Sequence, residues 1–213
     1  MIRPETSAAV KALSAKGQID LSADRPGLDG FVIQTVGDRL VLGGSRDRGT
    51  LFAVYYLLEK YFKVGFFWDG EYVPAAKDLV VPAIHLAQRP RFATRLAAVG
   101  GDYSYGGHWS IQQWKKELDW VPKNRFNTAC ISPHSQAVEK AALKKMGVVS
   151  QPITAEEKAD VESAKQIFDY ARMLDLEVPT PAPGPEVTSE FVKAHPEGKY
   201  FVSGWWANES EGR

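Results

Sequence analysis

The chain lacks the features that would mark a disulfide-stapled, nucleic-acid-binding or membrane-spanning protein. Its 213 residues include one cysteine, which excludes an internal disulfide framework and a multi-cysteine metal site. The 26 basic and 26 acidic residues cancel, whereas a nucleic-acid binder usually carries a basic excess to neutralise phosphates. No apolar run approaches the roughly 20 residues that cross a bilayer, and the first residues lack the apolar core of a signal peptide. We therefore expect a globular protein with no nucleic-acid partner and no membrane span.

The single cysteine, Cys130, lies inside the apolar run FNTACIS, which predicts a buried and inert thiol. The rest of the composition, 44% hydrophobic and 24% charged, is ordinary for a globular protein. The length suits one large domain or two small ones.

The first 88 residues are predicted to form a small α/β domain. Residues 29–43 alternate apolar and polar side chains around a Gly37-Asp38 turn, which is typical of a hairpin. A helix should follow at 46–62, and then a strand with a turn in VGFFWDGEYVP. The predicted apolar stripe of that helix consists of Leu51, Val54, Tyr55, Leu58 and Phe62. The proline-spaced stretch VVPAIHLAQRPRF predicts a domain boundary near residue 88.

The second half, residues 89–213, alternates strand-like and helix-like segments. Strands are expected at 92–99, 126–131 and 176–182, and helices at about 111–121, 155–174 and 185–194. This alternation predicts parallel βαβ units, the beginning of a barrel or of an open α/β sheet. Because the chain stops soon after on GWWANESEGR, we expect a truncated barrel that folds poorly in isolation.

Three tryptophans lie close together before the second predicted strand. Ser110 and Gln113 have the spacing of a capping box, so a helix should begin at Ile111 and end at Pro122. Helical phase places Trp114 in the core and Trp120 nearly opposite, in a second packing contact or partly exposed. Trp109 belongs to the loop after the first strand, where α/β folds build ligand sites.

The residues around these tryptophans resemble the first βα unit of the α-N-acetylglucosaminidases, glycoside hydrolase family 89. That family carries Tyr-Ser-Tyr, a Trp-rich loop, Trp-x-x-Glu-Ile-Asp-Trp, Asn-x-Ile-Asn and Gly-Gln-Glu-Ala. The matching residues here are Tyr103-Ser104-Tyr105, Trp109, Trp114, Glu117-Leu118-Asp119-Trp120, Asn124, Asn127 and Gln136-Ala137. Upstream, residues 47–74 resemble the small α/β domain before the barrel, which β-hexosaminidases and α-glucuronidases share. Residues 174–196 are similar to the family's third strand and the loop after it.

The sequence also departs from the family's pattern. An Asn-x-Cys pair at the end of the family's first strand contacts the sugar, and Ala97 and Val99 stand in those places. The segment between the second and third strands is much shorter here. In the Gly-Gln-Glu-Ala motif, Ser135 replaces the glycine and Ala137 the glutamate.

The resemblance implies a small N-terminal domain over residues 1–88 and the first βα units of a (β/α)8 barrel over residues 89–213. It implies hydrolysis of a terminal α-N-acetylglucosaminide or a related hexosaminide, with retention of configuration and without a cofactor. The expected partner is a glycan with such a terminal sugar. The place of action would be extracellular, periplasmic or lysosomal.

The resemblance places both catalytic carboxylates beyond residue 213, so this chain alone is expected to be inactive. Glu209 in WWANESE has the setting of a general acid, but its counterpart in the family is a loop after the third strand. The residues expected to line the sugar pocket are Asp102, Tyr103, His108, Trp109, His134 and Gln136. No metal is expected at His108 and His134, because no acidic residue stands at ligand spacing.

Three alternatives stay open. An α-glucuronidase-like or a β-hexosaminidase-like enzyme shares the N-terminal domain type. A non-catalytic carbohydrate-binding protein would have lost the carboxylates. The sequence leaves the oligomeric state open.

Overall fold

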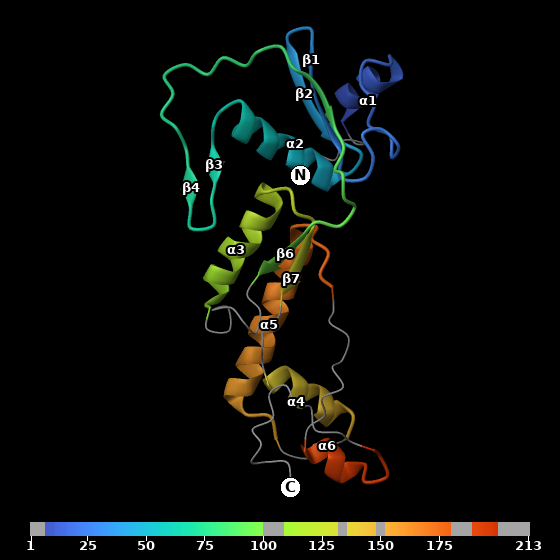
Figure 1. The fold of residues 1–213 in the computed structure, drawn as a ribbon, viewed down its shortest axis with the longest axis vertical. Coiled ribbons are helices and arrows are strands. Elements are labelled where there is room, and N and C mark those ends of the chain that lie inside the picture. Colours follow the sequence, from blue (N-terminus) through green and yellow to red (C-terminus); the bar gives the residue numbers. More distant parts are fainter. Residues whose placement is uncertain (1–6, 100–108, 132–135, 148–151, 180–188, 200–213) are drawn as a thin grey trace.

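The computed structural model describes residues 7–99, 109–131, 136–147, 152–179 and 189–199. Over these residues the chain is a mixed α/β protein (Figure 1). An antiparallel sheet lies in its N-terminal part, and a parallel pair of strands follows farther along the chain. The α/β class predicted from the sequence is thereby confirmed.

Strands β1 (Phe31–Val36) and β2 (Arg39–Gly44) form the predicted hairpin. Gly37 begins its turn with a φ of 62°, a conformation that glycine adopts without steric cost. Strand β5 (His85–Gln88) pairs antiparallel with the other side of β1, so the strand order is β2-β1-β5. Helix α1 (Ala8–Ala15), capped by Ser7, precedes the sheet and buries none of its residues.

Helix α2 (Asp47–Lys60) packs on this sheet, but in a different phase from the one predicted. Its buried apolar residues are Phe52, Ala53 and Leu57, which meet Phe31 and Ile33 of the sheet. Val54, part of the predicted stripe, is exposed. The reason is the close approach at Gly49, where a Cβ atom would lie 2.5 Å from the carbonyl oxygen of Gly30. The face of the helix that carries Gly49, Phe52 and Ala53 therefore turns toward the sheet.

A second, short hairpin joins β3 (Gly65–Phe66) to β4 (Glu71–Tyr72), where the sequence predicted a strand with a turn. Phe66 packs edge-on against Tyr55 of α2, with ring centroids 5.3 Å apart. The extended stretch from Val73 to Ala83 then leads back to β5 (Figure 1).

The parallel pair consists of β6 (Leu96–Val99) and β7 (Thr128–Ile131), joined through α3 (Ile111–Lys123). This is the predicted βαβ unit. Thr128 also forms a parallel bridge with Glu177, which marks the third predicted strand at one position. Helix α5 (Ala155–Met173) matches the predicted helix closely and packs beside α3. Tyr170 of α5 donates a hydrogen bond of 2.8 Å to Asp119 of α3.

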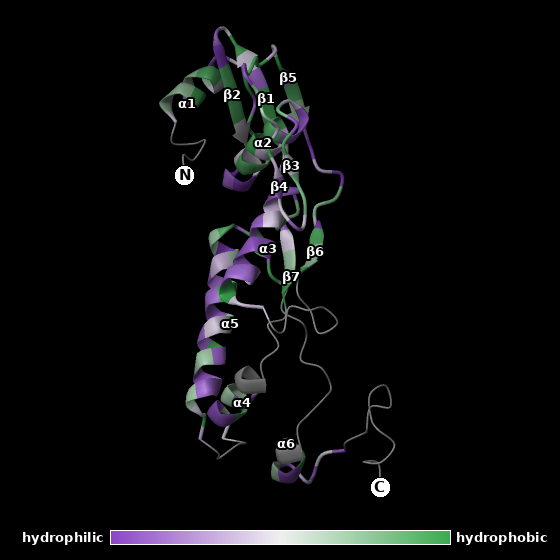
Figure 2. Cartoon of the chain, turned by 90° about the vertical axis from the view of Figure 1, so that its left-hand side faces the viewer, coloured by the Kyte–Doolittle hydropathy of each residue, from purple (hydrophilic) through white to green (hydrophobic). Residues whose placement is uncertain are grey.

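The side chains of the two parallel strands alternate between a covered and an open face. Ala97, Val99, Ala129 and Ile131 are buried in one core with Trp114, Leu118 and Val121 of α3. Leu96, Ala98 and Cys130 point the other way and are exposed, although Figure 2 shows β6 as apolar. The predicted burial of Cys130 was therefore wrong, because this thiol lies on the face without helices.

Two further helices complete the described residues. Helix α4 (Gln136–Lys145) was not predicted, although its run of Ala, Leu and Lys favours a helix. Helix α6 (Ser189–Ala194) is shorter than the predicted 185–194, part of which lies outside the described residues. The predicted boundary near residue 88 falls at the end of β5 and stays a prediction.

Candidate functional site

A buried cluster of charged side chains joins the N-terminal sheet to the parallel strands. At its centre is Asp29, in the turn before β1, with a side chain that is 2% exposed. Its carboxylate accepts hydrogen bonds from Arg46 at 2.7 Å, Arg48 at 2.9 and 3.1 Å, Arg95 at 2.9 Å and Asn127 at 2.8 Å. Burial alone would raise the pKa of Asp29, but hydrogen bonds from Arg48, Arg95 and Asn127 outweigh it and lower the pKa to about 2.

Arg48 extends the cluster from α2 to the third strand position. Besides holding Asp29, its guanidinium donates to the carbonyl oxygen of Asp175 and, at 3.2 Å, to the carboxylate of Glu177. The side chain of Asn127 also donates to the carbonyl oxygen of Ala93 at 2.6 Å. We call the group of Asp29, Arg46, Arg48, Arg95, Asn127 and Glu177 the charge clamp. No motif in the sequence marks the charge clamp, because its members are far apart along the chain.

The charge clamp lies where the parallel strands begin. Arg95 immediately precedes β6, Asn127 immediately precedes β7, and Glu177 bridges Thr128, the first residue of β7. Ligand sites of parallel α/β folds form at the opposite edge, where the strands end. The clamp is therefore a structural joint, and it leaves the carboxyl ends of β6 and β7 on the far side (Figure 1).

At the carboxyl ends, Trp109 is the predicted sugar-contacting residue whose side chain the structure describes. It is half-buried and meets Trp114 edge-on, with ring centroids 5.3 Å apart. The next residue, Ser110, caps α3, and the predicted capping box with Gln113 is present. The backbone from Trp109 onward therefore leads directly into the capped start of α3.

The other predicted pocket residues are not placed by the structure. Asp102, Tyr103, His108 and His134 lie outside the described residues, as does Glu209. Gln136 is the first residue of α4, and its side chain is likewise outside the description. A sugar pocket formed by these residues stays a prediction.

The structure also places the residues of the first predicted βα unit that the sequence singled out. Ala97 and Val99, which stand in place of the family's sugar-contacting pair, are buried against α3 and cannot face a ligand on the open side of the sheet. Trp114 is 2% exposed, as predicted for a core residue. Trp120 packs against the rim of the same core and stacks on Phe126 at 5.8 Å, which is the predicted second packing contact. Helix α3 continues through Pro122 to Lys123, slightly beyond its predicted end.

Two cavities lie in or beside the N-terminal sheet. One of about 530 Å³ is lined by residues of β1 and β5, by the segment before β1, which includes Asp24, and by Arg89 just after β5. Another of about 270 Å³ lies between Phe31, Phe52 and Phe126, next to the clamp. Neither borders Trp109. Within residues 7–99, 109–131, 136–147, 152–179 and 189–199, no group of His, Cys, Asp or Glu side chains is arranged to hold a metal ion.

No family model matches the chain, and no curated protein matches it either. None of the helices in the described parts of the chain has the length and apolar character to cross a membrane.

Proposed function

We propose that the chain is the N-terminal part of a glycoside hydrolase similar to family 89, with a small α/β domain followed by the first βα units of a (β/α)8 barrel. The open face of β6 and β7 carries this proposal. Parallel sheets occur almost always with both faces covered, whereas Leu96, Ala98 and Cys130 are exposed here. In a barrel this face points inward and is filled by side chains from the other strands.

The position of the N-terminal domain also supports a barrel enzyme. The charge clamp attaches this domain where the strands begin, which leaves the opposite edge free for a substrate. The half-buried Trp109 at that edge suits a platform for one face of a pyranose ring. The preceding residues Asp102, Tyr103 and His108 would bind the hydroxyl groups.

The chemistry requires two carboxyl groups on other strands. In a retaining glycosidase they are about 5–5.5 Å apart, one as nucleophile and the other as acid and then base. The resemblance places both beyond Arg213. The proposed substrate is a terminal α-N-acetylglucosaminide or a related hexosaminide.

Hydrolysis of three aryl glycosides tests the proposal. The protein extended past Arg213 to include the remaining strands should cleave the α-N-acetylglucosaminide faster than the α-glucuronide or the β-N-acetylhexosaminide. The 213-residue chain should cleave none of them. Preference for one of the other two substrates would select the corresponding alternative enzyme, and no turnover on any would leave only a carbohydrate-binding role.

The Trp109 platform has its own test. Trp109→Ala should raise KM for the preferred glycoside, whereas Trp109→Phe should retain most of the affinity because it keeps an aromatic face. Equal kinetics for both variants and the unaltered enzyme would remove Trp109 from the site.

A further inference from the structure

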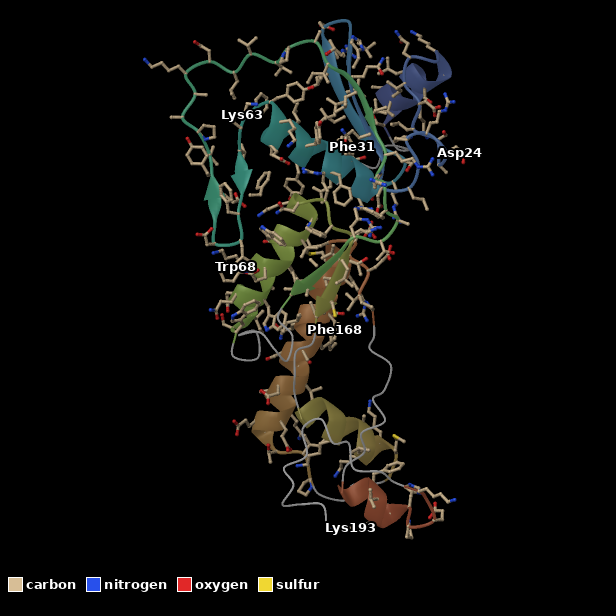
Figure 3. All side chains as sticks on the ribbon, viewed as in Figure 1. Asp24, Phe31, Lys63, Trp68, Phe168 and Lys193 are labelled. Carbon is tan, nitrogen blue, oxygen red and sulfur yellow. The ribbon has the colours of Figure 1, made fainter. Side chains whose placement is uncertain are left out.

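The turn between β3 and β4 presents two aromatic side chains to solvent. Phe67 and Trp68 are each 60% exposed in the turn of the short hairpin, where Figure 3 labels Trp68. The turn is closed by a hydrogen bond of 2.9 Å from the Phe67 amide to the carbonyl oxygen of Gly70. Exposed aromatic groups of this kind, when they gather in one place, mark interaction sites more often than single exposed apolar residues do.

The turn is held firmly against α3. Lys116 donates a hydrogen bond of 2.9 Å to the carbonyl oxygen of Asp69, and Lys123 pairs with Glu71 at 2.5 Å. Trp68 lines one hollow with Lys116 and Lys123 of α3. It also counters part of the rise that burial causes in the pKa of the nearly buried Glu117. The turn is therefore anchored to α3 while much of the Trp68 ring stays open to solvent. A ligand would find this ring already in position, so it loses little rotational freedom on binding.

The surroundings of Trp68 favour a sugar over a protein. The hollow between the hairpin and α3 is small, about 30 Å³, which is the space of roughly one water molecule. It is too small for the large anchor side chain that a protein partner usually inserts, but it suits a hydroxyl or methyl group. Lys116, Lys123 and Glu71 at its edge supply both donors and an acceptor, and charges of both signs.

We propose that Phe67 and Trp68 form a second, non-catalytic sugar-binding surface, which holds a neutral oligosaccharide with one pyranose ring stacked on the indole of Trp68. That this surface binds the substrate of the enzyme rests on the proposed glycosidase function. Glu117 lies seven residues after Ser110, the cap of α3. This spacing is about 10 Å along the helix. The surface would thus bind sugars of the same glycan that lie beyond the terminal residue.

Binding of a soluble N-acetylglucosamine tetrasaccharide tests the proposal by calorimetry, with a glucose tetrasaccharide and a sulfated oligosaccharide as comparisons. Trp68→Ala should weaken binding of the tetrasaccharide about tenfold or more. Trp68→Tyr should restore most of the affinity. The matched control is Phe92→Ala, because Phe92 is also exposed, at 65%, but does not line the hollow beside α3. This control should bind like the unaltered protein.

Several outcomes would overturn the proposal. They are no binding of any tetrasaccharide, binding of the sulfated probe alone, or equal affinity of the Trp68→Ala variant and the unaltered protein. Self-association that Trp68→Ala abolishes, seen by sedimentation, would instead identify a protein interface. Circular dichroism establishes that Trp68→Ala is folded, and Phe67→Ala, with an expected smaller loss of affinity, serves if it is not.

The same variants separate this proposal from the glycosidase function. In the extended protein, Trp68→Ala should leave hydrolysis of the small aryl glycoside unchanged and raise KM for the tetrasaccharide. Tetrasaccharide binding through Trp68 without any hydrolysis would uphold this surface and reject the enzyme. Hydrolysis by Trp68→Ala with an unchanged KM for both substrates would uphold the enzyme and reject this surface.

Discussion

Replacing Asp29 by asparagine tests whether the charge clamp joins the two parts of the chain. The substitution keeps the shape of the side chain and removes its charge. Asp29 has a φ of 61°, and asparagine tolerates this left-handed conformation better than most residues. The backbone therefore contributes little to the expected effect. The guanidinium of Arg48, whose side chain is 1% exposed, loses its principal counter-charge.

The size of the effect follows from the burial of Arg48. Removing one partner of a buried ion pair costs about 3–5 kcal/mol, because the remaining charge has neither water nor a counter-charge. Glu177 lies 3.2 Å from the same guanidinium and offsets part of this cost. We therefore expect the free energy of unfolding to fall by about 3 kcal/mol. This is a large part of the roughly 5–15 kcal/mol that stabilises a domain.

Urea denaturation at neutral pH, followed by circular dichroism, measures this loss. The matched control is Asp38→Asn in the hairpin turn, where the side chain is 95% exposed and 3.9 Å from Arg39. Its free energy of unfolding should change by no more than about 0.5 kcal/mol. A loss below about 1 kcal/mol for Asp29→Asn would refute the structural role of the clamp.

Acid unfolding gives a second measure of the same group. The pKa of Asp29 falls from 3.8 to about 2 in the folded protein. At about 1.4 kcal/mol per pKa unit, the folded state gains about 2 kcal/mol from this carboxylate. Because the folded pKa is depressed, this stability is present above pH 3.8 and is lost as the pH falls toward 2. Asp29→Asn should lack this part of the acid dependence, so an equally steep loss in both proteins would contradict the assignment.

Three further predictions follow from packing and exposure. Gly49→Ala should lower the free energy of unfolding by about 1–3 kcal/mol in urea denaturation, because the added Cβ lies 2.5 Å from the Gly30 carbonyl oxygen; an unchanged or higher stability would contradict that contact. Tyr170→Phe should lower the free energy of unfolding by about 1 kcal/mol, because it removes the hydrogen bond to Asp119. An unshifted denaturation curve for this variant would contradict that hydrogen bond. Cys130 should react with a thiol reagent in the native 213-residue chain and be protected in the extended protein. Equal rates in both would argue against a closed barrel.

The elements that the sequence predicted well carry strong local signals. The hairpin of β1 and β2 follows from strict alternation and the Gly37 turn, and both flanking strands begin and end close to the expected residues. Helix α3 starts at Ile111 because Ser110 and Gln113 cap each other, which a short sequence motif is sufficient to indicate. Trp114 is in the core because its neighbours at helical spacing are also apolar.

The features that the sequence did not reveal depend on distant residues. The phase of α2 is set by Gly49 against Gly30 of the sheet, and apolar residues on several sides of the helix conceal that choice. The contact between Arg48 and Glu177 joins residues 129 positions apart, and neither stands in a recognisable motif. Cys130 sits in an apolar run, but its face is decided by the pleat of β7 and by which side the helices cover.

The first sugar released by the extended protein tests most directly whether the chain begins a retaining glycosidase. Proton nuclear magnetic resonance during early turnover of an aryl α-N-acetylglucosaminide distinguishes the two anomers of the product before they equilibrate. We predict N-acetylglucosamine in the α configuration, since two successive displacements retain the anomeric centre. Release of the β anomer first would contradict retention, and no release of sugar would contradict the glycosidase function itself.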